Sequence, residues 1–155
     1  MLQNFEGDLL LVETLDGGDV EIENGLFVSD KQFSTAVYLS LFGGNKLDNG
    51  KTKSVNQFWG NLLRETTENE KLKSRFQFII TGLPMSVKNI KEAEKAAAID
   101  LQWFIDEKIA DVIDINGRAT GKNMFSLRVK ILKDKNNIFD NEYFLLWGGG
   151  DGTTV

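Results

Sequence analysis

Hydrophobic and polar positions alternate most regularly near the end of the chain. Every second residue from Phe125 to Ile131 is apolar, and most of those between are polar or charged. This period of two is typical of a strand with one face on a core and the other in water. "KDKNN" then predicts a turn, and residues 138–147 return as the second strand of a hairpin. The end of that strand is apolar on both faces, which predicts cover from both sides.

Longer periods predict three helices in the middle of the chain. "SDKQ" at residues 29–32 matches a capping box and predicts a helix over about 30–42 that stops at Gly43-Gly44. A second helix is expected from about Thr67, with Glu70 as its capping partner, to Gly82-Leu83-Pro84. Ser86 is expected to cap the longest helix, about 87–108. Its apolar stripe comprises Ile90, Ala93, Ala97, Leu101, Phe104 and Ile105.

The N-terminal segment reads as a β-meander. Residues 8–15 form an apolar strand-like run, "DGGD" supplies a turn, and Asn24-Gly25 is a second turn signal. A short strand over 110–116 opens the C-terminal third. The fold class expected is therefore α+β: an N-terminal meander, three helices including one long amphipathic helix, and C-terminal antiparallel strands ending in a hairpin. Residues 1–147 are expected to form one domain, and residues 148–155 a flexible Gly-rich tail.

Two features carry more apolar surface than a simple core requires. On the longest helix, Ala96, Ile99 and Trp103 lie nearly opposite the main stripe and form a second, narrower seam. Packing under the meander and contact with another protein chain both account for this seam. The second feature is "FWGN" at residues 58–61, which places two aromatic residues in a long loop.

Composition narrows the chemistry that the chain can perform. Among 155 residues there is no cysteine and no histidine, so disulfides, thiolate metal sites and histidine-based catalysis are excluded. The net charge of −5 argues against a nucleic-acid platform. The lysine-rich stretch at residues 46–53 reads as a solvated loop. The chain shows no signal peptide and no membrane-spanning run, and we expect a cytoplasmic product.

The acidic and glycine-rich stretches give only weak signals of a site. "DGGDVEIENG" holds four acids, but their spacing does not fit a calcium loop and their flanks resemble strands. "GGGDG" near the C-terminus lacks the lysine and the following helix of a phosphate loop. Glu13 or Glu65 with Asp100 are carboxylates of the type used in glycoside hydrolysis, yet nothing places them in one cleft. We expect no catalytic residue, metal or cofactor.

The order of several segments resembles one protein family. These segments are "DLLLVETLDGGDVEIENGLFVSD", "TAVYLSLFGGN", "FWGNLL", "EAEKAAAIDLQWFIDEKIADVIDI" and a final hairpin ending in "LLW". Together they resemble the Mu-type phage tail baseplate wedge family, over nearly the whole chain to about Trp147. The family tends to show "WWG" where this chain has Phe58, and a lysine-rich insertion precedes that loop. The Glu-Pro-Arg motif of better-known wedge relatives is absent, since Pro84 is the single proline.

The resemblance implies a structural role. Members are similar to the small wedge subunit of contractile tails, present in multiple copies in a sixfold baseplate assembled in the bacterial cytoplasm. The implied partners are other baseplate wedge proteins, the tail sheath and the tube or spike hub, with no nucleic acid and no membrane. The sheet would help to nucleate the sheath. The residues expected at partner interfaces are Phe58, Trp59, Gly60, Asn61, Ile99, Trp103, Tyr143, Leu145 and Trp147.

Two other classes of function remain open from the residues alone. The first is a non-catalytic cytoplasmic adaptor of the same fold that binds proteins outside any tail. The second is an enzyme acting on cell-wall glycans, which would need a carboxylate with a perturbed pKa in a cleft. An exposed edge strand in the terminal hairpin would favour the assembly role, because such an edge can accept a strand from another chain.

Overall fold

The computed structural model describes residues 8–14, 17–30, 33–43 and 74–148. Its contacts divide the chain into two compact units, Met1–Tyr38 and Leu39–Val155, and the boundary falls within a helix. The mixed α+β class expected from the sequence is confirmed. The expectation of one domain over residues 1–147 stays a prediction. The lysine-rich stretch, the "FWGN" loop and the Gly-rich tail beyond Gly148 lie outside the described residues.

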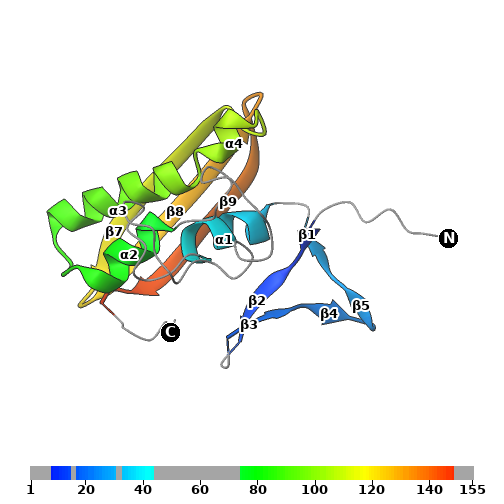
Figure 1. Cartoon of the computed structure of the whole chain (residues 1–155), viewed down its shortest axis with the longest axis horizontal. Helices are drawn as coiled ribbons and strands as arrows, with labels where there is room; N and C mark the ends of the chain where they lie inside the picture. The colour runs from blue at the N-terminus through cyan, green and yellow to red at the C-terminus, as the bar shows by residue number, and fades with distance from the viewer. Residues whose placement is uncertain (1–7, 15–16, 31–32, 44–73, 149–155) are drawn as a thin grey trace, which may run out of the picture. The chain divides into compact units, whose positions relative to one another are not determined.

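The first unit consists of three two-stranded antiparallel ladders (Figure 1). The three ladders pair β1 with β6, β2 with β3 and β4 with β5. The strands are β1 (Asp8–Leu9), β2 (Leu11–Thr14), β3 (Gly17–Val20), β4 (Ile22–Glu23), β5 (Leu26–Phe27) and β6 (Ser29–Asp30). The arrangement differs from a simple meander because the last strand closes back onto the first.

Single residues between β1 and β2, between β3 and β4, and between β5 and β6 join the three ladders at a common junction. The Leu10 N–H donates to the Val28 carbonyl, Val28 to Glu21, and Glu21 back to Leu10, with N···O distances of 2.9, 2.9 and 3.0 Å. These three bonds form a closed ring that uses backbone groups left free where the ladders end. The Asn24-Gly25 turn is confirmed: both residues have positive φ, as a two-residue hairpin turn requires.

The capping box expected at residues 29–32 is wrong. Ser29 pairs with Leu9 in a ladder, and the first helix, α1 (Ser34–Phe42), begins later. The end at Gly43 is as expected, because the Gly43 N–H donates to the Leu39 carbonyl. The expected turn at "DGGD" is also displaced, since Gly17 and Gly18 belong to β3. Pairing between distant strands has here overridden a local helix-start signal.

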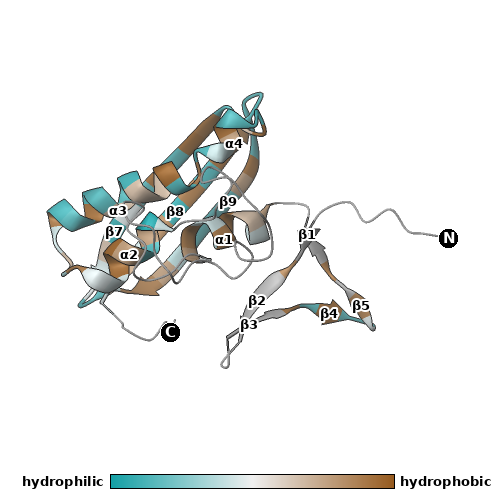
Figure 2. Ribbon diagram, viewed as in Figure 1, coloured by the Kyte–Doolittle hydropathy of each residue, from teal (hydrophilic) through white to brown (hydrophobic). Residues whose placement is uncertain are grey.

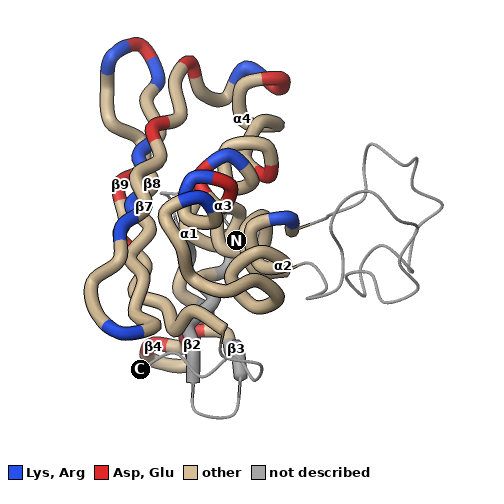
Figure 3. Tube along the Cα trace, turned by 90° about the vertical axis from the view of Figure 1, so that its left-hand side faces the viewer, with Lys and Arg blue, Asp and Glu red and all other residues tan. Residues whose placement is uncertain are grey.

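The second unit is a three-stranded antiparallel sheet with helices on one face (Figures 1 and 3). Its strands are β7 (Val112–Gly121), β8 (Met124–Lys133) and β9 (Asn136–Leu146), and β8 is central. The helices are the end of α1, α2 (Arg75–Gly82), α3 (Val87–Asp100) and α4 (Trp103–Asp106). The turn expected at "KDKNN" is confirmed, with Asp134 and Lys135 at positive φ between β8 and β9.

The helix starts were predicted with mixed success. Ser86 caps α3 as expected, since its hydroxyl accepts from the Asn89 N–H at 3.2 Å. The start expected near Thr67 is wrong for α2: that residue lies outside the described part, and Ser74 is the residue that caps the helix. The expected long helix tightens at Leu101-Gln102, where the Gln102 N–H bonds Ile99 three residues back. Lys108, at positive φ, follows its last turn.

The core lies between the helices and the sheet. The alternation predicted for β8 is confirmed, because Phe125, Leu127, Val129 and Ile131 are fully buried. The strands show this pattern as alternating hydrophobic and hydrophilic segments (Figure 2). The helices contribute Leu41, Phe76, Ile80, Ala93, Ala97, Leu101 and Phe104 to the same core. Edge-to-face aromatic contacts link α1, α2 and β9, with Phe42 touching both Phe76 and Tyr143.

Candidate functional site

The residues predicted to contact partners fall into three groups. The aromatic loop, Phe58 to Asn61, lies outside the described residues. On α3 and α4, Ile99 is 55% exposed, whereas the Trp103 ring is half-buried. The Trp103 Nε1–H donates to the Ser40 hydroxyl at 3.0 Å, and its ring stacks on Phe104 with centroids 4.0 Å apart. Trp103 thus binds α1 within this chain, and Ile99 is the exposed member of the second seam.

The third group lies at the end of β9 and contributes mainly to the fold. Tyr143 is half-buried against Phe42, while Leu145 is buried. Trp147 is 2% exposed, and its Nε1–H donates to the Leu83 carbonyl at 2.6 Å. The next backbone N–H, of Gly148, donates to the Ile80 carbonyl at 2.7 Å. These bonds satisfy carbonyl groups at the end of α2, so Trp147 locks that helix onto the sheet.

The strand register places a set of mostly polar side chains on the face of the sheet that the described helices leave uncovered. Residues opposite one another in an antiparallel ladder share a face. Asp114 is opposite Lys130, which is opposite Asp140; Asn116, Arg128 and Glu142 form the next row. In the third row Arg118, Ser126 and Phe144 lie side by side. We call this set of nine residues the open face (Figure 3, seen edge-on).

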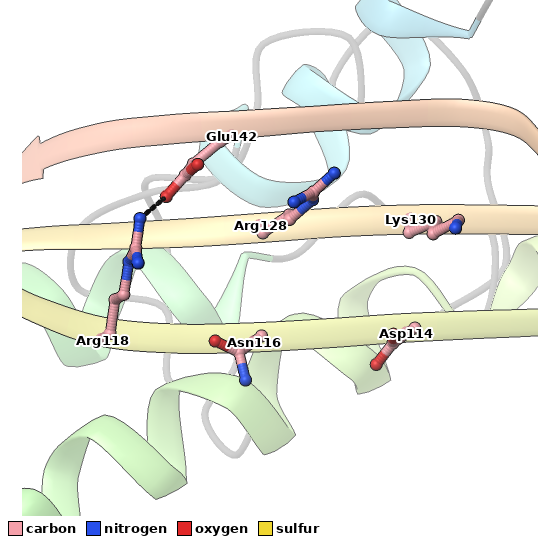
Figure 4. A pocket seen from close by; sticks show the side chains of 6 residues that line it. All are labelled: Asp114, Asn116, Arg118, Arg128, Lys130 and Glu142. Atoms are coloured by element: carbon pink, nitrogen blue, oxygen red, sulfur yellow. Dashed lines mark hydrogen bonds and ion pairs between the residues drawn. The ribbon is translucent and has the colours of Figure 1, made fainter.

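Ion pairs organise the charges of the open face. Arg128 binds Asp140 through two hydrogen bonds, Nε to Oδ1 and Nη2 to Oδ2, each 3.0 Å. Arg118 reaches over β8 to Glu142, with an Nη2···Oε1 distance of 2.9 Å (Figure 4). The Ser126 hydroxyl also donates to Glu142. The Arg128 hydrogen bonds lower the pKa of Asp140, and those of Ser126 and then Arg118 lower the pKa of Glu142.

The remaining polar groups of the open face surround a shallow depression. Asp114, Asn116 and Lys130 make no side-chain hydrogen bond or ion pair with the described residues. With Arg118, Arg128 and Glu142 they line a depression of about 460 Å³ (Figure 4). In the third row, opposite Ser126, the Phe144 side chain is 52% exposed. Asp114 and Lys130 still interact electrostatically with Arg128 and Asp140, so the open face is a charged surface with one exposed aromatic ring.

This surface was only partly foreseeable from the sequence. The alternation at residues 125–132 predicted a water-facing side of β8, but not which residues of β7 and β9 would join it. Strand register decides that, and one position of slip would reverse every side chain. The expectation that the end of β9 is covered on both faces is wrong, because Phe144 is left exposed by the described residues.

One buried carboxylate stands apart from the open face. The Asp100 side chain ends α3 with no exposed surface and accepts the Phe76 N–H at 2.9 Å and Arg75 Nη1 at 3.1 Å. Burial raises its pKa to about 7, and the bonds from Phe76 and Arg75 partly oppose that rise. These contacts hold the start of α2 against the end of α3, and we assign Asp100 a positioning role in the fold.

Two further observations on the described residues concern metal binding and membrane-spanning helices. Between residues 8 and 148, leaving out the gaps in the description, no group of three or more carboxylate side chains is arranged to hold a metal ion. No helix within the same residues is long and apolar enough to span a membrane.

The candidate functional site is therefore the open face together with the edges of its sheet. Comparison with known proteins adds no identity, because the chain matches no family profile, no curated protein and no solved structure.

Proposed function

We propose that this protein is a structural subunit of a phage or phage-like tail baseplate. In this role it joins the wedge and helps to nucleate the sheath, without catalysis. Support comes from the order of segments that resembles the Mu-type wedge family. The observation that carries most weight is the three-stranded sheet with helices on one face and an ordered, half-paired set of charges on the other. A subunit held between larger partners needs such a second face.

The outer strand of the C-terminal hairpin adds to this support. In an antiparallel ladder, alternate residues of an edge strand direct their backbone N–H and C=O groups away from the neighbouring strand. On β9 the Glu142 N–H donates to the side chain of the adjacent Asn141, at 3.0 Å, and this bond is exposed. A strand from another chain can replace a single exposed bond of this kind. We therefore place the partner strand of the sheath along β9.

The experiment is a pull-down from tail lysate with tagged protein. Large wedge and sheath proteins are expected to co-purify with the unchanged chain. Changing Phe58 and Trp59 together to Ala is expected to abolish recovery of the wedge proteins, because the aromatic loop is expected to anchor them. Circular dichroism must show that the variant is folded. The matched control changes two exposed apolar residues to Ala, Leu83 at the end of α2 and Val87 at the start of α3, and is expected to retain binding.

One result would overturn the proposal, and two others would exclude the loop as the anchor. If the folded protein recovers no tail component, the reading as a free adaptor takes its place. If the variant at Phe58 and Trp59 loses its fold, the loop belongs to the core of this chain, and the anchoring role is excluded. Loss of binding in the Leu83 and Val87 control as well would move the interface away from the loop.

A further inference from the structure

The two edges of the C-terminal sheet differ in how their backbone donors are satisfied. In the middle of β7, the Gly117 N–H donates to Glu94 Oε1 of α3 at 2.8 Å. Glu94 is held in place, since its Oε2 also pairs with Lys91 at 2.8 Å and its side chain is only 14% exposed. On β9 the corresponding acceptor is the exposed side chain of a neighbouring residue. The acceptor on β7 thus comes from a different element and is partly buried.

Without the Glu94 contact, the edge of β7 would be complementary to β7 of a second copy of this chain. Two copies of β7 can pair antiparallel about Asn116, which places Asp114 of one copy opposite Arg118 of the other. Opposite charges in directly facing positions stabilise a strand pair. Arg118 now pairs with Glu142, but an exposed ion pair of this kind contributes little and exchanges readily. Charge therefore favours the pairing of two β7 strands in this register.

The face of β7 that is covered by the helices fits the same register. Ile113 and Ile115 are only half-buried, and the register sets Ile115 opposite Gly117 of the second copy. Inside the chain this glycine is required, because a Cβ would lie 2.8 Å from the Phe125 ring and 3.1 Å from Glu94 Cγ. Pairing of two copies would bury apolar surface that is now partly exposed.

We propose that Glu94 guards the edge of β7 and prevents it from pairing with β7 of a second copy of this chain. In the register described above, Ile115 and Gly117 of the two copies would exchange backbone hydrogen bonds. Glu94 occupies the Gly117 N–H that this exchange needs. Edge strands that lack such protection are templates for association. This inference does not rest on the proposed baseplate role, since it concerns the isolated chain alone.

The test measures the mass of purified protein in solution over a range of concentrations by light scattering. The unchanged chain is expected to be monomeric. Glu94→Ala is expected to raise the apparent mass toward twice that of the monomer as concentration increases. Glu94→Gln keeps an oxygen acceptor and is expected to stay monomeric. The matched control is Glu92→Ala, which removes an exposed acid on the same helix whose partner is Lys95, and it is expected to stay monomeric.

A second change tests the register. Arg118→Glu in the Glu94→Ala background places two acids opposite each other and is expected to restore the monomer. If Glu94→Ala does not fold, Glu94→Asp withdraws the carboxylate by one methylene while keeping its charge, and it should also dimerise. A folded Glu94→Ala or Glu94→Asp that stays monomeric overturns the proposal. So do a dimer of the unchanged chain, a dimer of Glu92→Ala, and a dimer that persists with Arg118→Glu.

Discussion

The two faces of the C-terminal sheet are built from the same three strands but contribute differently to stability. On the covered face, Phe125, Leu127, Val129 and Ile131 have no exposed surface. On the open face, Arg128 of β8 pairs with Asp140 at 3.0 Å, and Arg118 of β7 pairs with Glu142 at 2.9 Å. Buried apolar area supplies most of the folding free energy, whereas exposed ion pairs supply little. Stability therefore resides mainly on the covered face, and the open face contributes little to it.

Removing one phenylalanine from each face should give the largest contrast. Phe125 packs against Phe76 and Trp147, so Phe125→Ala leaves a cavity in the core and should lower the free energy of unfolding by about 3–5 kcal/mol. Phe144→Ala, on the open face, should cost less than about 1 kcal/mol. Urea unfolding followed by tryptophan fluorescence measures both. Equal losses would mean that Phe144 is covered by part of the chain and that the open face is not open.

The covered face was the part of the fold most accessible from the sequence. The apolar positions of β8 repeat with the period of a strand, and their burial follows from that period. On α3 the period predicted most of the buried residues, but Ala96, assigned to the second seam, is buried as well. Ser86 was found as a cap because its signal is local and nothing competes with it. Ser29 carried a similar signal, yet it pairs with Leu9 in a ladder. No local pattern reveals a partner twenty residues away in the sequence.

The candidate site was less accessible, for reasons that differ between residues. Trp147 was expected at a partner interface together with Tyr143 and Leu145, but its indole N–H donates to the Leu83 carbonyl at the end of α2 and the ring is buried. Charged residues such as Asp114 and Arg118 were passed over because charge alone usually marks a solvated surface. Their grouping depends on strand register, and the capping of Gly117 by Glu94 depends on how α3 crosses β7.

A pH-dependent difference should appear at the boundary of the covered core. The pKa of Asp100 is raised from 3.8 to about 7 in the folded chain because the carboxyl is buried. Between these two values the folded state holds a proton that the unfolded state has released. The contribution of Asp100 to stability is therefore largest below pH 3.8, falls as pH rises toward the folded-state pKa of about 7, and then levels off. We expect a loss of about 1–3 kcal/mol between pH 5 and pH 8.

Asp100→Asn is the matched variant for this measurement. It keeps an oxygen that can accept the Phe76 N–H but carries no charge at any pH. Its stability should match that of the unchanged chain near pH 5 and exceed it at pH 8. The exposed acids with lowered pKa, such as Asp111 and Asp140, have already ionised above pH 5 and leave this window undisturbed. Parallel pH profiles for the two proteins would show that Asp100 is not the titrating group.

The smallest effect is expected for the ion pair between Arg128 and Asp140 on the open face. A double-mutant cycle with Arg128→Ala and Asp140→Ala isolates their coupling in unfolding experiments. The coupling should be near the detection limit and should vanish in 1 M salt, because water and ions screen an exposed pair. A large coupling that resists salt would mean that the pair is shielded and supports the fold. A small coupling energy would mean that the fold does not depend on this pair. Replacing the two charges should then weaken binding of a partner protein without changing the free energy of unfolding.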